Sequence, residues 1–552
     1  MREIDRLTTA RYGIPSLLLM DSASSSCFAA ISAHYDGRVT GLQVLILCGK
    51  GNNGGDGAGL AQLLAREGAQ CTVILFGLLS ETQGDARTNF DHVSRLADSA
   101  LLSFIECDDS STWDQLAEID QEYDVIVDAL FGTGLTRGVD GVHRKVIDHL
   151  RSLREARERA GENRPLIVSV DIPSGLHADL PEPIGPAVKA DLTVTFTAPK
   201  PANVLPPSSD LGGELIVADI GSPRSLVEET ALPKLFLVEA EDVRLWLKST
   251  RYVPGSYKNT HGNVLIAAGS RGYSGAAALC ANAAMRSGAG LVTVATPASA
   301  QPLVASSSMP EVMTRALAET DRGAVSDEAV DHFLKLAGKK GTVVAIGPGL
   351  TSDDERTRRF VRVIVERRST ACVVDADGLN CLAPWPSGLK GSAKHPLVLT
   401  PHLGEMARLM GATSEIKDRV AVAREFATTN QVILVLKGSR SLVAAPDGRV
   451  FVNPTGNPGL GTAGSGDTLT GLTSGFLAQS LATLKDKTDP LAAVIAALFI
   501  GGLAGDFAAR KIGMRTMVAS DIRDHFSDAI RFLDRNGEQP QMQLRQHRDD
   551  AE

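Results

Sequence analysis

The residues with the clearest chemical potential belong to a glycine-rich segment, Asn453–Asp467, that leads into an apolar helical pattern. Small residues from Ala463 to Gly466 leave backbone N–H groups free at a helix N-terminus, and such an end binds phosphate. Asp467 follows, where a carboxylate can accept a proton from a substrate hydroxyl while the amides stabilise a transferring phosphoryl group. The short pattern Gly-x-Gly-Asp alone is also compatible with an acidic residue that only stabilises the first turn of a helix. The whole segment favours a phosphoryl-transfer site.

A second glycine-rich segment, Gly49–Asp56, follows an apolar strand pattern and opens a helix. Its glycines have the spacing G-x-G-x-x-G, which lets backbone amides approach a pyrophosphate: Gly49, Gly51 and Gly54. This pattern also fits a glycine-rich turn without a ligand. However, three residues of the segment carry side-chain oxygens: Asn52, Asn53 and Asp56. No acidic residue ends the next strand at Phe76, so we expect a ligand held differently from that of a dehydrogenase.

Two further predicted strand ends bring oxygen atoms to the same edge, Asp128 after one strand and Asp171 with Ser174 after another. The carboxyl ends of parallel strands converge at the binding crevice. Asn53, Asp128 and Ser174 are suited to ligate a hard cation, which prefers oxygen donors. Alternatively, Asp128 caps a helix and Asp171 is a turn residue. Three oxygen-bearing strand ends in one domain favour the site.

The elements that position these residues alternate between β-branched runs and helical stretches, which predicts parallel strands with crossover helices. The first series of expected strands is Leu42–Cys48, Cys71–Phe76, Val125–Asp128, Leu166–Val170, Leu192–Phe196 and Leu215–Val217. The second begins near Asn263 and continues with Gly290–Ala295, Thr342–Ile346, Ala371–Val374, Leu397–Leu399 and Val432–Leu436. The stretch from Gly221 to Trp246 has no clear period and separates the two α/β domains.

Four turns follow strands of the second series and are placed to line one rim. They are Gly347–Leu350, Asp375–Asn380, Thr400–Glu405 and Leu436–Ser441. On its own, His402 beside a proline is also compatible with a turn residue, and Lys437 with an ordinary surface lysine.

Length and composition exclude several classes of protein. The length of 552 residues predicts three to four domains of average size or two large ones. A composition of 43% apolar and 22% charged residues excludes a disordered, collagenous or coiled-coil chain. The net charge is −9 without long basic runs, which argues against nucleic acid or an anionic membrane surface as partner.

The cysteines and the apolar runs point to a cytoplasmic protein. Seven cysteines without a Cys-x-x-Cys pair indicate a reduced compartment and no zinc site. The first residues carry Arg2, Glu3 and Asp5, so no signal peptide is expected. The longest apolar run, Leu491–Gly505, is shorter than the roughly 20 residues that span a bilayer, and we interpret it as a buried helix.

Four motifs of the first domain resemble the NAD(P)H-hydrate epimerase family from Leu7 to about Gly221. They are Gly-Asn-Asn-Gly-Gly-Asp-Gly at 51–57, Asp-Ala-Leu-Phe-Gly-Thr-Gly at 128–134, Asp-Ile-Pro-Ser-Gly-Leu at 171–176 and Thr-Ala-Pro-Lys at 197–200. The resemblance implies that the hydrated nicotinamide nucleotide is bound by Asn52, Asn53, Gly54, Gly55, Asp56, Gly132, Thr133, Gly134, Leu135, Thr136, Arg137, Gly138 and Asp171. It also implies potassium on Asn53, Asp128 and Ser174. Members usually read Leu-Met-Glu-Asn-Ala-Gly where this chain has Leu-Met-Asp-Ser-Ala-Ser at 19–24.

The segments of the second domain together resemble ADP-dependent NAD(P)H-hydrate dehydratase, a ribokinase relative, over roughly Leu235 to Phe532. The resemblance implies that the hydrated nucleotide is contacted by Ala276, Gly349, His402 and Asp467. It implies that the adenine nucleotide is held by Lys437, Gly438, Ser439, Arg440, Ser441 and Gly466. Magnesium is expected to accompany ADP.

The two resemblances imply a bifunctional repair activity. One domain interconverts the (R) and (S) hydrates, with Asp171 as the candidate acid/base, and the other dehydrates the (S) form at the expense of ADP, giving AMP and phosphate, with Asp467 as the base. The alternative is a ribokinase-type small-molecule kinase whose first domain senses a nucleotide or binds a protein.

We expect a Rossmann-like three-layer domain at 1–229, a ribokinase-like α/β domain at 230–540 and a disordered tail at 541–552. A homo-oligomer is expected, with no nucleic-acid or membrane partner.

Overall fold

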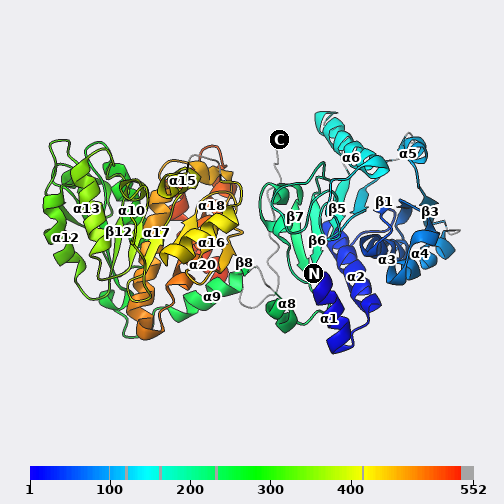
Figure 1. The fold of residues 1–552 in the computed structure, drawn as a ribbon, viewed down its shortest axis with the longest axis horizontal. Coiled ribbons are helices and arrows are strands. Elements are labelled where there is room, and N and C mark those ends of the chain that lie inside the picture. The colour runs from blue at the N-terminus through cyan, green and yellow to red at the C-terminus, as the bar shows by residue number, and fades with distance from the viewer. Residues whose placement is uncertain (98–99, 118–121, 161–164, 231–233, 413–415, 536–552) are drawn as a thin grey trace. The chain divides into compact units, whose positions relative to one another are not determined.

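The computed structural model describes residues 1–535 except 98–99, 118–121, 161–164, 231–233 and 413–415 (Figure 1). The chain divides into two compact units, and the division lies between Pro233 and Lys234. The sequence pattern places the boundary at 229–230. The expected disordered tail, 541–552, lies outside the described residues.

The first unit contains a seven-stranded parallel sheet in the order β3-β2-β1-β4-β5-β6-β7. The strands are β1 (Gln43–Cys48), β2 (Gln70–Leu75), β3 (Leu102–Glu106), β4 (Val125–Ala129), β5 (Leu166–Val170), β6 (Leu192–Phe196) and β7 (Glu214–Ala218). The helices are α1 (Arg2–Tyr12), α2 (Ser16–His34), α3 (Asn52–Arg66), α4 (Gly84–Leu96), α5 (Ser110–Ala117), α6 (Gly141–Ala160), α7 (Pro201–Val204) and α8 (Arg224–Thr230). The strand order reverses direction at β1, so the β1 and β4 ends border the crevice of a doubly wound sheet.

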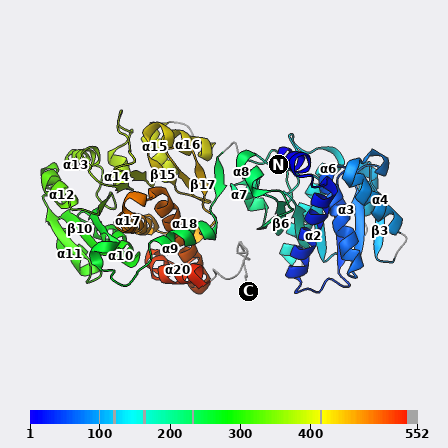
Figure 2. The same cartoon turned by 90° about the horizontal axis from the view of Figure 1, so that it is seen from below.

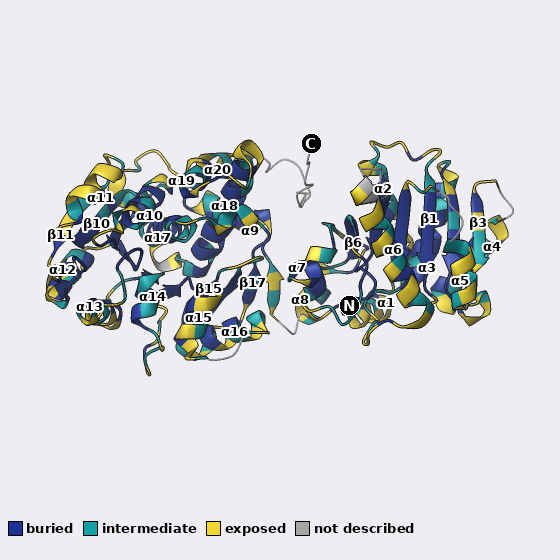
Figure 3. Ribbon diagram, turned by 90° about the horizontal axis from the view of Figure 1, so that it is seen from above, coloured by how far each residue is buried: buried dark blue, intermediate teal, exposed yellow. Residues whose placement is uncertain are grey.

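Helices cover both faces of this sheet, because alternate residues of each strand point to opposite sides. Val44 and Ile46 of β1 join the core formed with α2, α3 and α4. Leu45 and Leu47 join a second core with Trp113 of α5 and with α6. Figure 3 shows the strands as the most buried layer. The predicted three-layer α/β architecture of the first domain is confirmed.

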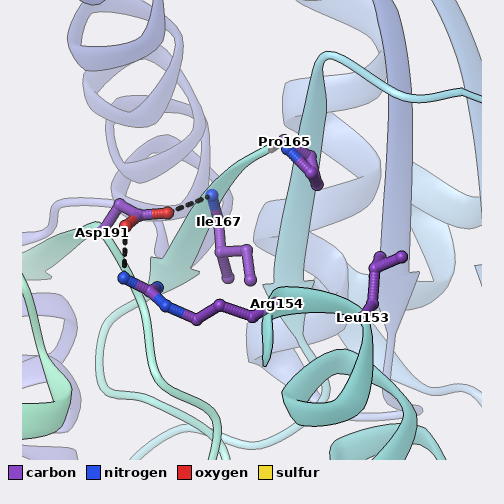
Figure 4. A pocket seen from close by; sticks show the side chains of 5 residues that line it. All are labelled: Leu153, Arg154, Pro165, Ile167 and Asp191. Atoms are coloured by element: carbon purple, nitrogen blue, oxygen red, sulfur yellow. Dashed lines mark hydrogen bonds and ion pairs between the residues drawn. The ribbon is translucent and has the colours of Figure 1, made fainter. Parts of the chain in front are cut away.

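An ion pair connects α6 to the N-terminal ends of β5 and β6 (Figure 4). The Arg154 guanidinium lies 3.0 Å from Oδ1 of Asp191, and Oδ2 of Asp191 accepts a hydrogen bond of 3.0 Å from the Ile167 backbone. Only 11% and 16% of the two side chains are exposed, so the pair fixes the helix against the connection that precedes β6.

The second unit contains a ten-stranded sheet in the order β11-β10-β9-β12-β13-β14-β15-β16-β17-β8. Its strands are β8 (Leu235–Leu237), β9 (Asn263–Ala267), β10 (Leu291–Pro297), β11 (Met313–Leu317), β12 (Thr342–Ile346), β13 (Cys372–Val374), β14 (Leu397–Leu399), β15 (Ile433–Leu436), β16 (Leu442–Ala444) and β17 (Val450–Val452). The pairs from β11 to β15 are parallel, whereas β15, β16 and β17 are successively antiparallel. The predicted α/β class is confirmed for this unit too.

The helices of the second unit flank the sheet (Figure 2). They are α9 (Ala240–Ser249), α10 (Ser274–Arg286), α11 (Gln301–Ser307), α12 (Val330–Ala337), α13 (Glu355–Glu366), α14 (Asp377–Cys381), α15 (Leu403–Met410), α16 (Arg419–Asn430), α17 (Ser465–Leu484), α18 (Pro490–Ile512), α19 (Ala519–Asp524) and α20 (Phe526–Arg535). The aperiodic stretch between the two domains therefore contains α8, β8 and the start of α9.

Two of the described helices, α2 and α18, are long and apolar enough to cross a membrane by length and composition. Helix α18 is longer than the apolar run that marks it, and 72% of its most apolar window is buried within the protein. The predicted buried helix is confirmed. In α2, Leu19, Met20, Cys27 and Ile31 contribute to the core of the first unit.

Close packing of α17 against α10 requires a glycine at position 475. A Cβ there would collide with the Ser287 hydroxyl, and Trp246 stacks on the neighbouring Phe476 at 4.2 Å between ring centroids. Gly475→Ala is expected to destabilise the second unit by about 1–3 kcal/mol through overpacking. The measurement is calorimetric unfolding of the full chain. The control is Gly275→Ala on α10, where a Cβ meets no atom within 4 Å, and equal transition temperatures for both variants would contradict this account.

Candidate active sites

The first site begins where β1 ends and α3 starts at Asn52. A Cβ on Gly49 would collide with the carbonyl of Leu130, and a Cβ on Gly54 would collide with the carbonyl of Gly49. Gly49 is therefore required for the close approach of the β1 and β4 ends, and Gly54 for the close approach of α3 to the loop after β1, whereas a Cβ on Gly51 would meet no atom within 4 Å. The consequence for the site is that Asn53 lies beside Gly132, at the start of the loop that follows β4.

Asp171, at the end of β5, is held in one orientation by neighbours from β6 and α7. Its backbone has a φ of +69°, a conformation that non-glycine residues adopt mainly where the surrounding structure enforces it. Oδ1 forms a buried ion pair with Lys200 and accepts a 3.1 Å hydrogen bond from Thr195. The Lys200 ammonium also donates to Thr195 Oγ1 at 2.8 Å and to the Phe196 carbonyl at 3.0 Å. Asn203 donates to the Asp171 carbonyl at 3.3 Å.

The second carboxylate oxygen of Asp171 faces the space above Gly132. Asp171 Oδ2 lies 3.3 Å, and Asn53 Oδ1 3.0 Å, from the point that a Cβ on Gly132 would occupy. The structure thus brings together a fixed carboxylate and an amide from two elements that the sequence predicted to converge. A fixed carboxylate with one oxygen outside the contacts to Lys200 and Thr195 has the arrangement of a general base.

Asp56 is the fifth residue of α3, in the segment expected to hold the ligand. Burial raises the pKa of the Asp56 carboxyl well above its usual range, and the negative charges of Asp171 and Asp5 raise it further, against the opposing charge of Lys200. Ser24 of α2, within the segment that differs from the family pattern, donates to the Asp56 carbonyl at 2.9 Å.

Asp128 is a fully buried residue of β4, so its interpretation as a helix cap is wrong. It accepts hydrogen bonds of 2.8 Å from the Ser169 hydroxyl and 2.8 Å from the Ser174 backbone. The Ser174 hydroxyl accepts a hydrogen bond of 2.9 Å from the backbone N–H of Phe131. Phe131 directly precedes Gly132, which lies beside Asn53. Burial raises the pKa of Asp128, and the serine hydrogen bonds oppose this shift. Among the described residues, no Lys or Arg forms an ion pair with it.

The loop Gly132–Gly138 runs along the surface at this edge. Gly132, Thr133 and Leu135 are half-buried, and the other residues of the loop are exposed. Gly138 packs against the Ile184 carbonyl, since a Cβ there would stand 3.2 Å from it. The loop thus places backbone groups beside Asn53 and Asp171, as expected for part of one site.

The second site is organised around a half-buried cation, Lys437, at the end of β15. Lys437 Nζ lies 2.7 Å from Oδ1 of Asp375 and 3.8 Å from Oε2 of Glu405. Asp375, 1% exposed at the end of β13, also accepts a 2.6 Å hydrogen bond from Thr470 of α17. Only 19% of the Lys437 side chain is exposed, so the interpretation as an ordinary surface lysine is wrong.

Asp467 lies in the first turn of α17 beside this cluster. Burial, followed by the charge of Asp375, raises its pKa to about 7, although Lys437 acts in the opposite direction. A Cβ on the preceding Gly466 would stand 3.4 Å from Lys437 Nζ and 3.6 Å from Asp375 Oδ2. Among the described residues, no side chain caps the α17 N-terminus, which begins after Gly464 at a φ of +85°. A free helix end, a cation and a carboxyl that titrates near neutrality therefore meet at one point.

His402 is the N-cap of α15, so the turn interpretation is confirmed, and its interpretation as a ligand-binding residue stays a prediction. Its Nδ1 accepts from the Gly404 backbone at 3.0 Å and the Glu405 backbone at 3.2 Å, while the Glu405 carboxylate accepts from the His402 backbone at 2.8 Å. Because Nδ1 is an acceptor, Nε2 carries the proton of the neutral ring. The side chain is 54% exposed and can present that proton to a ligand.

Gly349 and Ala276 are brought together, as expected, although they come from different elements. Gly349 has a φ of +64°, and a Cβ on it would stand 3.0 Å from that of Ala276 and 2.8 Å from the Tyr273 carbonyl. The space at this contact is therefore kept open by a glycine that also needs the left-handed conformation.

The loop Lys437–Ser441 is fixed at both ends. Arg419 donates to the Ser439 carbonyl at 2.8 Å, Gly438 donates to Ser441 Oγ at 3.2 Å, and the Arg440 guanidinium donates to the Pro454 carbonyl. The loop thereby contacts the start of the glycine-rich segment that was expected to form the phosphate cradle.

Asp506 of α18 holds that segment from the other side. It accepts hydrogen bonds from the Gly456 backbone at 3.0 Å and from Asn457 at 2.9 Å.

Several site residues were not identified from the sequence: Lys200, Thr195 and Asn203 in the first unit, and Glu405, Thr470, Arg419 and Asp506 in the second. Lys200 is the last residue of the Thr-Ala-Pro-Lys motif at 197–200, and Asp375 is the first residue of the turn Asp375–Asn380; neither residue had a predicted role. Their position after predicted strands was the available signal.

Comparison with known proteins identifies the family. The family model described as "YjeF-related protein N-terminus" matches residues 16–202, and the model described as "NAD(P)H-hydrate dehydratase" matches residues 264–527. The chain is 41% identical over 539 residues to the bifunctional NAD(P)H-hydrate repair enzyme Nnr of Moorella thermoacetica, covering 97% of this chain and 96% of that protein. It is 36% identical to the protein of that name from Thermofilum pendens, covering 96% and 95%.

A solved structure is similar to the second unit. It is the ADP/ATP-dependent NAD(P)H-hydrate dehydratase from Bacillus subtilis co-crystallised with ATP and Mg²⁺, at 30% identity and a TM-score of 0.45, covering 54% of this chain and 98% of that one. The two family models fall in the two units described above, and the relatives are matched over nearly their whole length. The chain therefore belongs to the family of bifunctional NAD(P)H-hydrate repair enzymes.

Proposed function

We propose that this protein repairs hydrated nicotinamide nucleotides, with the first unit interconverting the (R) and (S) hydrates and the second dehydrating the (S) form. The observation that carries the proposal is the placement of Asp467 beside Lys437 at an uncapped helix N-terminus, in a chain whose relatives bear the repair-enzyme name over their full length. A base, an anion site and a cation are what phosphoryl transfer to a hydroxyl requires.

In the second unit, the hydrated nucleotide contacts Ala276, Gly349, His402 and Asp467, and ADP is held by the loop Lys437–Ser441 and by Gly466. The contact between Gly349 and Ala276 and the exposed side chain of His402 support the first set. The proximity of Lys437 Nζ to Gly466 supports the second set. ADP enters with magnesium, whose charge is balanced by the diphosphate.

Phosphorylation turns a poor leaving group into a good one. Asp467 accepts the proton of the hydroxyl on carbon 6 of the hydrated ring, and the oxygen attacks the β-phosphoryl group of ADP, so that AMP leaves. Lys437 and the amides of α17 stabilise the charge that spreads over the phosphoryl oxygens. The ring nitrogen lone pair then expels phosphate, a ring proton is lost, and the double bond of the reduced nicotinamide is restored. The balance is hydrate plus ADP giving NAD(P)H, AMP and phosphate.

In the first unit, Asp171 is the acid/base at the reacting carbon. Lys200 and Thr195 hold one carboxylate oxygen, and the other faces the space beside Asn53 and Gly132. The segment Asn52–Asp56 and the loop Gly132–Gly138 bind the rest of the nucleotide. A chiral dehydratase site uses one hydrate epimer, so an epimerase on the same chain makes the other usable.

Potassium fits the oxygens of Asn53, Asp128 and Ser174. The fit is supported by the fully buried Asp128 carboxylate, which receives hydrogen bonds from hydroxyl and amide groups and has no ion-pair partner among the described Lys and Arg residues. A buried carboxylate of this kind is stabilised by a cation. When bound, the ion supplies positive charge beside the nucleotide. The expected homo-oligomeric state and cytoplasmic location stay predictions.

Asp467→Asn is expected to lower ADP-dependent recovery of NADH absorbance from the (S) hydrate by at least about 10²-fold, because the amide cannot accept the hydroxyl proton. Binding of ADP should change little. Asp331→Asn, at a side chain that is 91% exposed, is the matched control and should behave as wild type. Retention of full activity by Asp467→Asn would reject the assigned role.

The dehydration rate is expected to rise with pH through a midpoint near 7, since Asp467 acts as a base only after it loses its proton. Asp375→Asn removes a negative charge that raises the pKa of Asp467, so the midpoint should move to lower pH. Asp377→Asn should shift it in the same direction but less, because Asp377 contributes less to the pKa. The measurement is the pH profile of kcat/KM for the (S) hydrate at saturating ADP. An upward or absent shift in both variants contradicts the assignment.

Asp171→Ala is expected to slow conversion of the (R) hydrate by at least about 10²-fold while the second unit still dehydrates the (S) hydrate. Chromatographic separation of the epimers measures both steps in the same full-length protein. The control is Asp179→Ala, an exposed residue on the connection that follows Asp171. Equal epimerisation by the two variants would show that Asp171 is not the acid/base.

A further inference from the structure

Helix α1 lies outside the segment matched by the first family model, yet it is part of the first unit. Ile4 and Leu7 are buried against Leu226 of α8. Thr8 is fully buried and donates a 3.3 Å hydrogen bond to the Ser222 hydroxyl. The position of α1 is therefore set by apolar and polar contacts along one face.

The first turn of α1 borders the epimerase site. The charges of Lys200 and Asp171 act on the Asp5 carboxyl, and Asp5 in turn contributes to the raised pKa of Asp56. Arg2 lies one turn before Asp5 on the same helix face, because residues i and i+3 are neighbours. Arg2 Nη2 stands 2.5 Å from the point that a Cβ on Gly134 would occupy. Glycine at 134 thus leaves room for the guanidinium.

Arg2 differs from the other two arginines of α1 in its surroundings. Arg6 pairs with Glu3 at 2.7 Å, and Arg11 pairs with Glu229 at 3.1 Å. Within the described ranges, no carboxylate lies within 4.0 Å of the Arg2 guanidinium, and no hydrogen bond from it is formed. Arg2 is exposed, so its donors are accessible at the loop Gly132–Gly138.

We propose that Arg2 binds a phosphate oxygen of the hydrated dinucleotide held by the loop Gly132–Gly138. This inference rests on the proposed epimerase function of the first unit. The planar guanidinium presents paired N–H donors that match phosphate oxygens, and its charge complements the pyrophosphate of the substrate. Helix α1 then supplies a substrate contact from outside the segment that the family model covers.

The test compares Arg2→Ala with Arg6→Ala in the full-length protein. Both variants remove one exposed arginine of α1, but only Arg2 faces the loop. Epimerisation kinetics are measured with two substrates, the (R) hydrate of NADH and the hydrate of reduced nicotinamide riboside, which has no phosphate. Dehydration of the (S) hydrate by the second unit serves as the internal control for intact protein.

The expected result is an about tenfold rise in KM for the hydrate of NADH in Arg2→Ala, with kcat unchanged, since one charge-assisted contact is lost. Arg6→Ala should match wild type, and Arg2→Ala should match wild type on the riboside. Equal kinetics of the two variants on the hydrate of NADH would overturn the proposal, as would an equal loss on the riboside. A wild-type protein that leaves the (R) hydrate unconverted would instead reject the epimerase function, and the role of Arg2 with it.

Discussion

The arrangement of both sites depends on a buried or half-buried lysine paired with a buried carboxylate at the end of a parallel strand. In the second unit, Lys437 and Asp375 neutralise each other at 2.7 Å and leave Asp467 as the carboxyl whose charge changes near neutral pH. In the first unit, Lys200 fixes one oxygen of Asp171 and leaves the other free. Breaking one partner of such a pair would leave an uncompensated buried charge, which is strongly destabilising. The pairs therefore fix the orientation of Asp171 in the first unit and place a positive charge beside Asp467 in the second.

The sequence was sufficient to predict the two α/β units and which candidate site residues lie together. Parallel strands that are buried on both faces appear as continuous apolar runs, so β1, β4 and β12 were recognisable directly. The glycine spacing before α3 and α17 marked the helix N-termini, and the packing at Gly49 and Gly54 explains why no other residue fits there. Asp128 and Asp171 were found because strand ends converge at one edge.

The elements and residues that were missed lack a local signal. β3 is an edge strand with polar Ser103 and Glu106, and β16 and β17 have three residues each, so none forms an apolar run of ordinary length. Lys200, which was missed, pairs with a residue 29 positions away, and Lys437, which was predicted as a nucleotide-binding residue, has its ion-pair partner 62 positions away. Lysine is rarely buried, so residue type alone favours the surface, and only the folded sheet shows which carboxylate each lysine meets.

In the proposed reaction, the carboxylate of Asp467, the cation of Lys437 and the free N-terminus of α17 together make the hydroxyl of the hydrate easy to expel. The most direct measurement incubates the wild-type protein with a mixture of both hydrate epimers and ADP, and quantifies NADH, AMP, phosphate and any phosphorylated nucleotide. The account predicts complete return of both epimers to NADH, with one AMP and one phosphate formed for each. Accumulation of a stable phosphorylated hydrate without NADH would contradict it.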